Sequence, residues 1–446
     1  MKKIVIVGGG AGGMTAAVQL KRADKENTIT VVEKGDNVSW AGCPIPYFIA
    51  GELPVKTVIH YTPDYFREQG INIMVNTAAK KIDFEKKEIE IEQNGKIESL
   101  RYDELILSCG AKPVQIEIAG AEKINKGIFK ISNADDGIKI KAFIEKEKPK
   151  NAIIAGSGFI GLEMAEAFCK LGLKVTIVEK SHKFSPTMSD KVREVLIKKC
   201  YENKIELILD NGVKEVSSAD EKLRAVILEN GEKLEADILL LSVGIKPNID
   251  ILKNSGYKFI KEGVILPDKF LRVAESVYTI GDMIFTKNCI TDSYVYTPLG
   301  DVADRQALIA AQNIMEKEKE YRGVLQSFAT SFFEMKIAGT GLKKEQAEEF
   351  GYKAESIVVK AYTKNGAFAD SKPGEIEVIY DIDKKILLGA FMVGEEAVAQ
   401  FIDLFSVVIY KRIPVEEFID FDYSYSPTNS VVWNPLLAVY RKLIWK

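Results

Sequence analysis

Residues 4–13 read IVIVGGGAGG, an apolar run that passes directly into a glycine-rich turn. The pattern predicts a buried strand, a tight turn and a helix, followed by a second strand that ends at Glu33. Residues 152–161 repeat it as AIIAGSGFIG, and the strand that follows ends at Glu179. Both copies contain G-x-G-x-x-G and close on an acidic residue about 20 residues later, so the chain is predicted to hold two dinucleotides.

Each part of this repeated unit has a physical role in holding a pyrophosphate. The first glycine permits the tight turn, the second lets the backbone approach the phosphates, and the third lets helix and strand pack closely. The helix N-terminus offers free N–H groups, and the final glutamate accepts hydrogen bonds from a ribose diol. The residues predicted to bind the first nucleotide are Gly8, Gly10, Ala11, Gly12, Gly13 and Glu33, and those for the second are Gly156, Gly158, Ile160, Gly161 and Glu179.

A third motif indicates which nucleotide each unit binds. Residues 277–282, VYTIGD, form an apolar strand that ends in Gly-Asp, where an aspartate can hold the ribityl hydroxyls of a flavin. The first unit is therefore predicted to bind FAD and the second NAD(P)H. Glu179 favours NADH because a carboxylate repels a 2′-phosphate, while Lys180 and Lys183 keep NADPH as an alternative.

Composition narrows the class of protein. The 446 residues are 46% hydrophobic and 28% charged, with a net charge of −3 and a pI near 5.9. Nucleic-acid and membrane surfaces need a basic excess that this chain lacks, so neither partner is expected. No run approaches the roughly 18 apolar residues of a membrane helix. The five scattered cysteines predict a reducing, cytoplasmic setting rather than a disulfide framework.

Cys43 is the cysteine whose placement points to chemistry. It lies in residues 39–47, SWAGCPIPY, and no second cysteine follows at C-x-x-C or C-x-x-x-x-C spacing. A lone thiol must take its second sulfur, or an oxygen, from a substrate. Because Pro44 suits a first helical turn, we expect Cys43 to cap a helix whose dipole favours the thiolate. The other four are expected to be unreactive, without a base or partner: Cys109, Cys169, Cys200 and Cys289.

Together these motifs resemble the pyridine nucleotide–disulfide oxidoreductase family over essentially the whole chain. Residues 102–113 resemble its first crossover between domains, residues 236–248 its return crossover, and residues 281–282 its second FAD motif. The resemblance implies an α/β fold with two Rossmann-like domains and a C-terminal α+β dimerisation domain. The implied boundaries are 1–115 and 248–325 for the FAD domain, 116–247 for the NAD(P) domain and 326–446 for the dimerisation domain.

The resemblance also implies further contacts with both nucleotides. Phe159 resembles the ring that covers the flavin until NAD(P)H displaces it, and Glu163 resembles a carboxylate near the nicotinamide amide. The remaining implied FAD contacts are Lys34, Ser39, Ala79, Ser108, Gly110, Gly281, Asp282, Pro298 and Leu299, and Gly244 is implied for NAD(P).

The segment S-x-x-x-C-x-x-P-Y around Cys43 resembles the single-cysteine branch of this family. That branch holds coenzyme A-disulfide reductases, NADH oxidases and peroxidases, and sulfur or persulfide reductases. The implied reaction is the reduction of a small disulfide, persulfide or polysulfide through a mixed disulfide on Cys43, with coenzyme A species favoured. The peroxidases and oxidases usually carry a histidine in the first glycine loop, which here holds only glycine and alanine. An NADH oxidase that cycles Cys43 through sulfenic acid is the alternative.

A polar stripe on the first predicted helix bears on the substrate. Thr15, Gln19 and Arg22 share one helical face and, with Ser39, resemble the coenzyme A site of the branch. A solvated helix face is the competing interpretation, since surface helices are polar on one side. The coenzyme A reductases carry asparagine at the position of Gly42, so this sequence departs there from the coenzyme A site of the branch.

Residues 422–427, DYSYSP, resemble the family's D-x-x-Y-A-P segment. The resemblance implies a homodimer with a shared active site, in which Tyr425 faces the reactive sulfur of the other subunit and donates a proton. A second family tyrosine is replaced by Phe368, which can pack but cannot donate. A reductase of an electron carrier, or a redox-sensing flavoprotein, is the alternative from another class.

Overall fold

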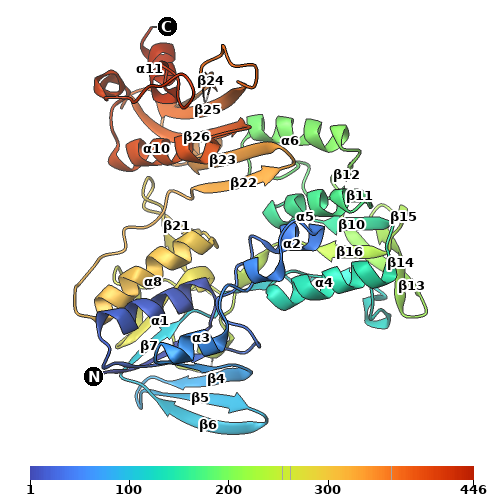
Figure 1. The fold of residues 1–446 in the computed structure, drawn as a ribbon, viewed down its shortest axis with the longest axis vertical. Helices are drawn as coiled ribbons and strands as arrows, with labels where there is room; N and C mark the ends of the chain where they lie inside the picture. Colours follow the sequence, from blue (N-terminus) through green and yellow to red (C-terminus); the bar gives the residue numbers. More distant parts are fainter. Residues whose placement is uncertain (254, 262, 363, 446) are drawn as a thin grey trace.

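The computed structural model describes residues 1–253, 255–261, 263–362 and 364–445, arranged as three sheet-containing units (Figure 1). The first unit is built on a six-stranded sheet whose central strand β1 is buried along Ile4–Val7. Strand order is β18 (Arg272–Ala274), β19 (Val277–Thr279), β7 (Glu104–Leu107), β1 (Lys3–Val7), β2 (Thr28–Val32) and β3 (Ile71–Met74). The strands from β19 to β3 are parallel, so the ends of β1, β2, β7 and β19 share one edge.

Two helices far apart in the sequence cover this sheet side by side, α1 (Ala11–Ala23) and α8 (Gly300–Ile314) (Figure 1). Small buried residues such as Ala16, Ala307 and Ala310 permit their close approach. The unit is completed by α3 (Pro63–Glu68), the antiparallel sheet β4 (Thr77–Asp83), β5 (Glu88–Gln93) and β6 (Lys96–Arg101), α7 (Asp250–Lys253), and the hairpin β20 (Phe285–Lys287) and β21 (Tyr294–Tyr296).

The second unit has a similar architecture, built on a five-stranded parallel sheet. Its order is β12 (Glu206–Ile208), β11 (Lys174–Val178), β10 (Asn151–Ala155), β16 (Ile238–Leu241) and β9 (Ile128–Phe129). The buried runs of β10 and β16 are apolar throughout, as expected for strands covered on both faces. Around them lie α4 (Ala134–Glu147), α5 (Phe159–Lys170), α6 (Asp190–Glu202), and the antiparallel strands β13 (Val213–Ala219), β14 (Lys222–Leu228) and β15 (Lys233–Glu235).

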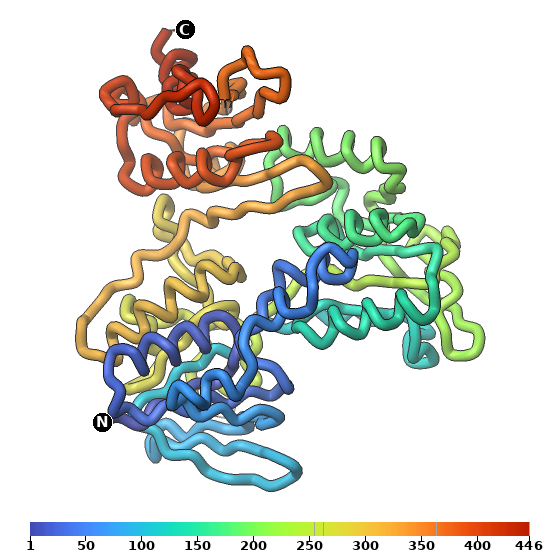
Figure 2. Tube along the Cα trace, in the orientation of Figure 1, coloured from blue at the N-terminus to red at the C-terminus, as the bar shows by residue number. Residues whose placement is uncertain are grey.

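The third unit is an antiparallel sheet with helices on it, at the C-terminal end of the molecule (Figure 2). Its order is β22 (Phe328–Phe332), β23 (Met335–Gly341), β26 (Ile386–Gly394), β25 (Pro373–Asp381) and β24 (Ala354–Tyr362), with α9 (Lys344–Glu349), α10 (Val398–Lys411) and α11 (Pro435–Ile444). The predicted α/β class, with two Rossmann-like units and a C-terminal α+β unit, is confirmed. The first two units are joined through the antiparallel pair β8 (Ala111–Pro113) and β17 (Ile245–Pro247).

The short helix α2 (Ile45–Ala50) leaves the first unit and packs against α4 and α5 of the second (Figure 1). Ile45, Phe48 and Ile49 are buried in the same apolar core as the second and third units. The predicted domain boundaries stay predictions, but this helix shows that the segment after Cys43 is packed with the second unit. Among the described residues, no helix is long and apolar enough to cross a membrane.

Candidate active site

The first glycine turn contains two kinds of glycine. Gly8 and Gly13 are required by close backbone packing, whereas Gly10 faces open space that a ligand can occupy. Gly8 has φ +103°, and a Cβ there would lie 2.1 Å from the Ser108 carbonyl oxygen. A Cβ on Gly13 would lie 1.9 Å from the Gly8 oxygen, so this glycine lets α1 pack on β1. A Cβ on Gly10 would meet nothing within 4 Å. The space beside Gly10, at the N-terminus of α1, therefore fits the close approach of a pyrophosphate.

Glu33 is held at the edge of this turn by backbone donors. Its Oε2 accepts from the Gly9 N–H at 2.7 Å, and its Oε1 accepts from the Gly35 N–H at 2.7 Å. The carboxylate is thereby oriented at the end of β2 and retains lone pairs for a ribose diol.

The Asp282 side chain is a partly buried carboxyl without a hydrogen-bond donor from the described residues. Burial raises the pKa of its carboxyl to about 6, and no described residue donates a hydrogen bond to it. Its backbone is fixed, because the Tyr296 hydroxyl donates to the Asp282 carbonyl oxygen at 3.0 Å and the Gly281 N–H donates to Gln306 at 2.7 Å. A desolvated carboxyl without donors fits the ribityl hydroxyls of a flavin.

The second glycine turn has the same construction. A Cβ on Gly156 or Gly161 would collide with backbone oxygens at 2.4 and 2.2 Å, whereas Gly158 faces open space. Glu179 accepts from the Ser157 N–H and hydroxyl at 2.9 and 2.6 Å. Its other oxygen accepts from the Ser181 N–H at 2.9 Å. Lys180 pairs with Glu229 at 2.9 Å, while Lys183 is exposed.

Most other predicted FAD contacts lie at the shared edge of the first sheet or directly after it. Ser108 and Gly110 follow β7, and Pro298 and Leu299 precede α8. Lys34 and Ser39 follow β2, and the Ser39 N–H donates to the Gly9 oxygen at 2.8 Å. One predicted FAD residue lies elsewhere, since Ala79 is on β4 of the neighbouring sheet. Gly244, predicted for NAD(P), lies between β16 of the second sheet and β17.

Cys43 lies on an exposed turn directly before α2, and all five cysteines are free. The expectation that Cys43 caps this helix is wrong, because Pro44 is the capping residue and Pro46 occupies the first turn. Within one subunit, the surroundings of Cys43 raise the pKa of its thiol. Although Cys43 is exposed to solvent, the surrounding protein partly desolvates its thiol, which raises the pKa. The carboxylates of Glu163 and Asp301 raise this pKa further, and the Cys43 backbone N–H lowers it. Burial also raises the pKa of the other four thiols, to about 12 for Cys109 and Cys200 and to about 11 for Cys169.

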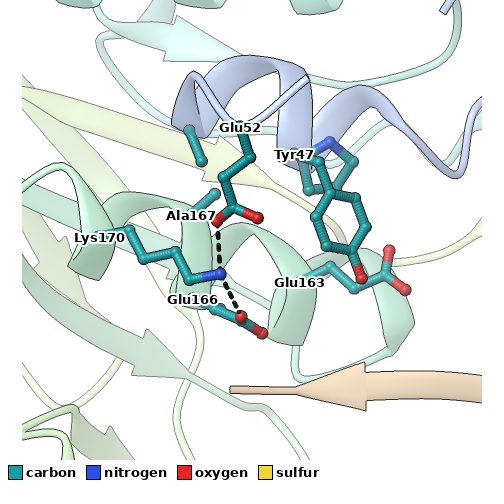
Figure 3. A pocket seen from close by; sticks show the side chains of 8 residues that line it. Tyr47, Glu52, Glu163, Glu166, Ala167 and Lys170 are labelled. Carbon is teal, nitrogen blue, oxygen red and sulfur yellow. Dashed lines mark ion pairs between the residues drawn. The ribbon is translucent and has the colours of Figure 1, made fainter. Parts of the chain in front are cut away.

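A polar network joins the helix after Cys43 to the helix after the second glycine turn (Figure 3). Tyr47 of α2 and Glu163 of α5 point toward one another in a small pocket. The Tyr47 hydroxyl lies 2.9 Å from that of Ser331, and Thr330 donates to Glu163 at 2.8 Å. Burial raises the pKa of the Glu163 carboxyl and the nearby Glu166 raises it, while the Thr330 hydrogen bond lowers it.

The same pocket contains an ion-pair network. Lys170 lies 2.5 Å from Glu52 and 2.7 Å from Glu166 (Figure 3). Glu166 is 6% exposed and also accepts from the Phe333 N–H at 2.7 Å. α2 is thus tied both to α5 and to the third unit.

The predicted substrate stripe lies on the face of α1 beside α8. Thr15 donates to Asp304 of α8 at 2.7 Å, which engages its hydroxyl. Gln19 is half-buried, and Arg22 is exposed at the end of the helix. Their contact with a substrate stays a prediction.

Tyr425 lies in the segment between the 3₁₀ helix Val415–Asp420 and α11. It is exposed, and its hydroxyl accepts from the Asn365 side-chain amide at 3.5 Å. No hydrogen bond joins it to Cys43 within the described part of this subunit. Phe368 is exposed on the neighbouring loop.

Known proteins share this arrangement. A family model for pyridine nucleotide-disulphide oxidoreductases matches residues 2–316, and one for the dimerisation domain of these enzymes matches residues 327–435. The chain belongs to the pyridine nucleotide-disulphide oxidoreductase family. Members of this family use FAD and NAD(P)H, and the open space at Gly10 and Gly158 and the partnerless carboxyl of Asp282 fit both groups.

Relatives within this family differ in their named acceptor. An NAD(P)H sulfur oxidoreductase (CoA-dependent) of Pyrococcus furiosus is 32% identical over 99% of both chains. An NADH oxidase of Methanocaldococcus jannaschii is 31% identical over 97% of both chains. The structure of a NAD-dependent persulfide reductase from A. fulgidus is 28% identical, covers 99% of this chain and 83% of that one, and superposes with a TM-score of 0.94.

Sequence reasoning did not identify the partners of Glu163 and Tyr47. Tyr47 belongs to a recognisable motif, but Thr330 and Ser331 do not. Their roles come from packing between segments far apart in the sequence, which a local motif does not reveal.

Proposed function

We propose that this chain is an FAD-dependent NAD(P)H oxidoreductase that reduces a small disulfide, persulfide or polysulfide through the single redox-active Cys43. The observation that carries the proposal is the free, exposed Cys43 on the turn before α2, beside the helix of the second nucleotide unit. An enzyme with an internal disulfide would need a second cysteine at this turn, and none of the other four follows it there.

When bound, FAD supplies the two-electron connection between NAD(P)H and sulfur. Cys43 holds the substrate sulfur as Cys43–S–S–R. Two electrons break this S–S bond, which leaves the Cys43 thiolate and releases RS⁻, or sulfide from a persulfide. The thiolate then attacks the next R–S–S–R, so that Cys43–S–S–R forms again and a second RS⁻ leaves.

We propose a coenzyme A disulfide or persulfide as the preferred substrate. The CoA-dependent name of the Pyrococcus furiosus relative and the stripe Thr15, Gln19 and Arg22, with Ser39, support it. A positively charged Arg22 can pair with a phosphate of coenzyme A. NADH is the expected donor, because the fixed carboxylate of Glu179 disfavours a 2′-phosphate, and exposed Lys183 leaves NADPH as a weaker donor.

The working form is proposed to be a cytoplasmic homodimer. The dimerisation domain and the exposed position of Tyr425 support a site completed by the second subunit. Five unpaired cysteines fit a reducing compartment.

The test compares Cys43→Ser with the unaltered enzyme. NADH oxidation that depends on coenzyme A disulfide or polysulfide should fall by at least about 100-fold, with FAD content unchanged. Cys289→Ser, which removes another partly exposed thiol, should keep full turnover. Full activity of Cys43→Ser would end the proposal. Mass spectrometry of the isolated protein should show a coenzyme A adduct on Cys43.

An NADH oxidase is the second candidate, favoured by the name of the Methanocaldococcus jannaschii relative. Oxygen consumption, measured beside disulfide-dependent NADH loss, separates the two. Rapid NADH oxidation with oxygen alone, together with a sulfenic acid on Cys43, would favour the oxidase.

A further inference from the structure

One strand of the third unit contacts the functional side chains of both helices beside Cys43. β22 is the edge strand of its sheet and packs against α5. Three of its residues make separate contacts. The Phe328 ring lies 5.2 Å from the Phe159 ring, the Thr330 hydroxyl is 2.8 Å from Glu163 Oε1, and the Ser331 hydroxyl is 2.9 Å from that of Tyr47.

The Thr330 hydroxyl binds only one of the two carboxylate oxygens of Glu163. Thr330 donates to Oε1, and no described residue is bonded to Oε2. Glu163 lies one turn after Phe159, at the start of the helix that begins at the second glycine turn. A carboxylate fixed through one oxygen presents the other in a constant direction, without the loss of side-chain freedom on binding.

We propose that Thr330 is a positioning residue for the nicotinamide, which orients Glu163 so that its free oxygen accepts a hydrogen bond from the carboxamide of NAD(P)H. This inference rests on the proposed function and on the prediction, drawn from the family resemblance, that Glu163 lies near the nicotinamide amide. It assigns to the third unit a part in binding the reductant, in addition to its part in the dimer.

Electrostatics indicate why a neutral donor is placed there. Glu163 faces Tyr47 of α2 (Figure 3), its charge raises the pKa of the Cys43 thiol, and it lies near Glu166 on its own helix. Lys170 is occupied by Glu52 and Glu166, so it does not neutralise Glu163. Burial and Glu166 raise the pKa of Glu163, and the Thr330 hydrogen bond lowers it. Without the Thr330 hydroxyl the pKa of Glu163 would rise, so the ionised carboxylate would be present only at higher pH.

The test uses Thr330→Val, which keeps the shape of the side chain and removes the hydroxyl. We expect KM for NADH to rise roughly ten-fold, as for the loss of a hydrogen bond to a charged group, with KM for the disulfide unchanged. The acid limb of kcat/KM for NADH should move to higher pH, because the pKa of Glu163 rises when its donor is lost. Thr330→Ser should restore both values.

Ser356→Ala is the matched control. It removes another hydroxyl–carboxylate bond of the same sheet, at 2.8 Å to Glu377 on β25, and should leave both NADH values unchanged. If Thr330→Val loses FAD, Thr330→Ala makes the same comparison.

Three results would overturn the inference. The first is a normal KM and acid limb in Thr330→Val when Glu163→Gln raises KM. The second is an equal rise in KM for NADH and for the disulfide, which indicates general damage to the site. The third is a normal KM in Glu163→Gln, which would remove the nicotinamide contact itself. None of these touches the chemistry of Cys43, which the Cys43→Ser comparison tests separately.

Discussion

The reactive thiol lies in an acidic setting within one subunit. Burial raises the pKa of Cys43, and Glu163 and Asp301 raise it further. In the proposed cycle this is no obstacle, because breaking the Cys43–S–S–R bond releases the sulfur directly as a thiolate. When no substrate is present, a raised pKa favours protonation of that thiolate. The neutral thiol that results reacts poorly with oxidants.

Glu163→Gln should therefore make Cys43 more reactive. Removing a carboxylate that repels the thiolate lowers the pKa of Cys43. The rate of iodoacetamide alkylation of the reduced enzyme, followed against pH, should reach its midpoint at lower pH. Asp304→Asn, on α8 beyond Asp301, is the control and should leave the midpoint in place. An unchanged midpoint in Glu163→Gln would show that Glu163 does not act on Cys43.

At the scale of elements, α2 is the least predictable part of the site. The motif around Cys43 indicates a reactive turn, but α2 is only six residues long and cannot be stable alone. Its position comes from the second unit. Lys141 of α4 donates to the Phe48 carbonyl at the end of α2 at 3.0 Å, and Lys170 of α5 pairs with Glu52. The glycine turns could be predicted because their requirements are local, whereas these lysines are ordinary surface types whose partners lie about 100 residues away.

Lys170→Met should destabilise this junction. The change leaves buried Glu166 without its cation, and the loss of one partner of a buried pair costs about 3–5 kcal/mol. Because Lys170 is 38% exposed, we expect roughly 1–2 kcal/mol after solvent screening. Thermal unfolding, followed by flavin fluorescence, should show a lower Tm. Lys139→Met, which removes an exposed lysine of α4, should not change it.

At the scale of the whole molecule, the two nucleotide turns could be predicted because each follows a repeated local pattern. The three units and their order were predicted from the family resemblance. The sequence did not predict that one edge strand, β22, contacts side chains of both helices at the site. That contact depends on how the third unit sits against α5, which hydrophobic periodicity does not encode. The dimer presents the same difficulty, because Tyr425 is exposed and far in sequence from Cys43.

Subunit mixing tests whether Tyr425 acts across the dimer. Tyr425→Phe should lower turnover by about 100-fold if its hydroxyl donates the proton. In a heterodimer of Cys43→Ser and Tyr425→Phe subunits, one site would combine an intact Cys43 with the intact Tyr425 of the other subunit. Two nearly inactive proteins, exchanged under mild denaturation, should then regain up to about half the activity per heterodimer. If each subunit used its own tyrosine, no site would be intact. Activity would then stay at the level of the parents.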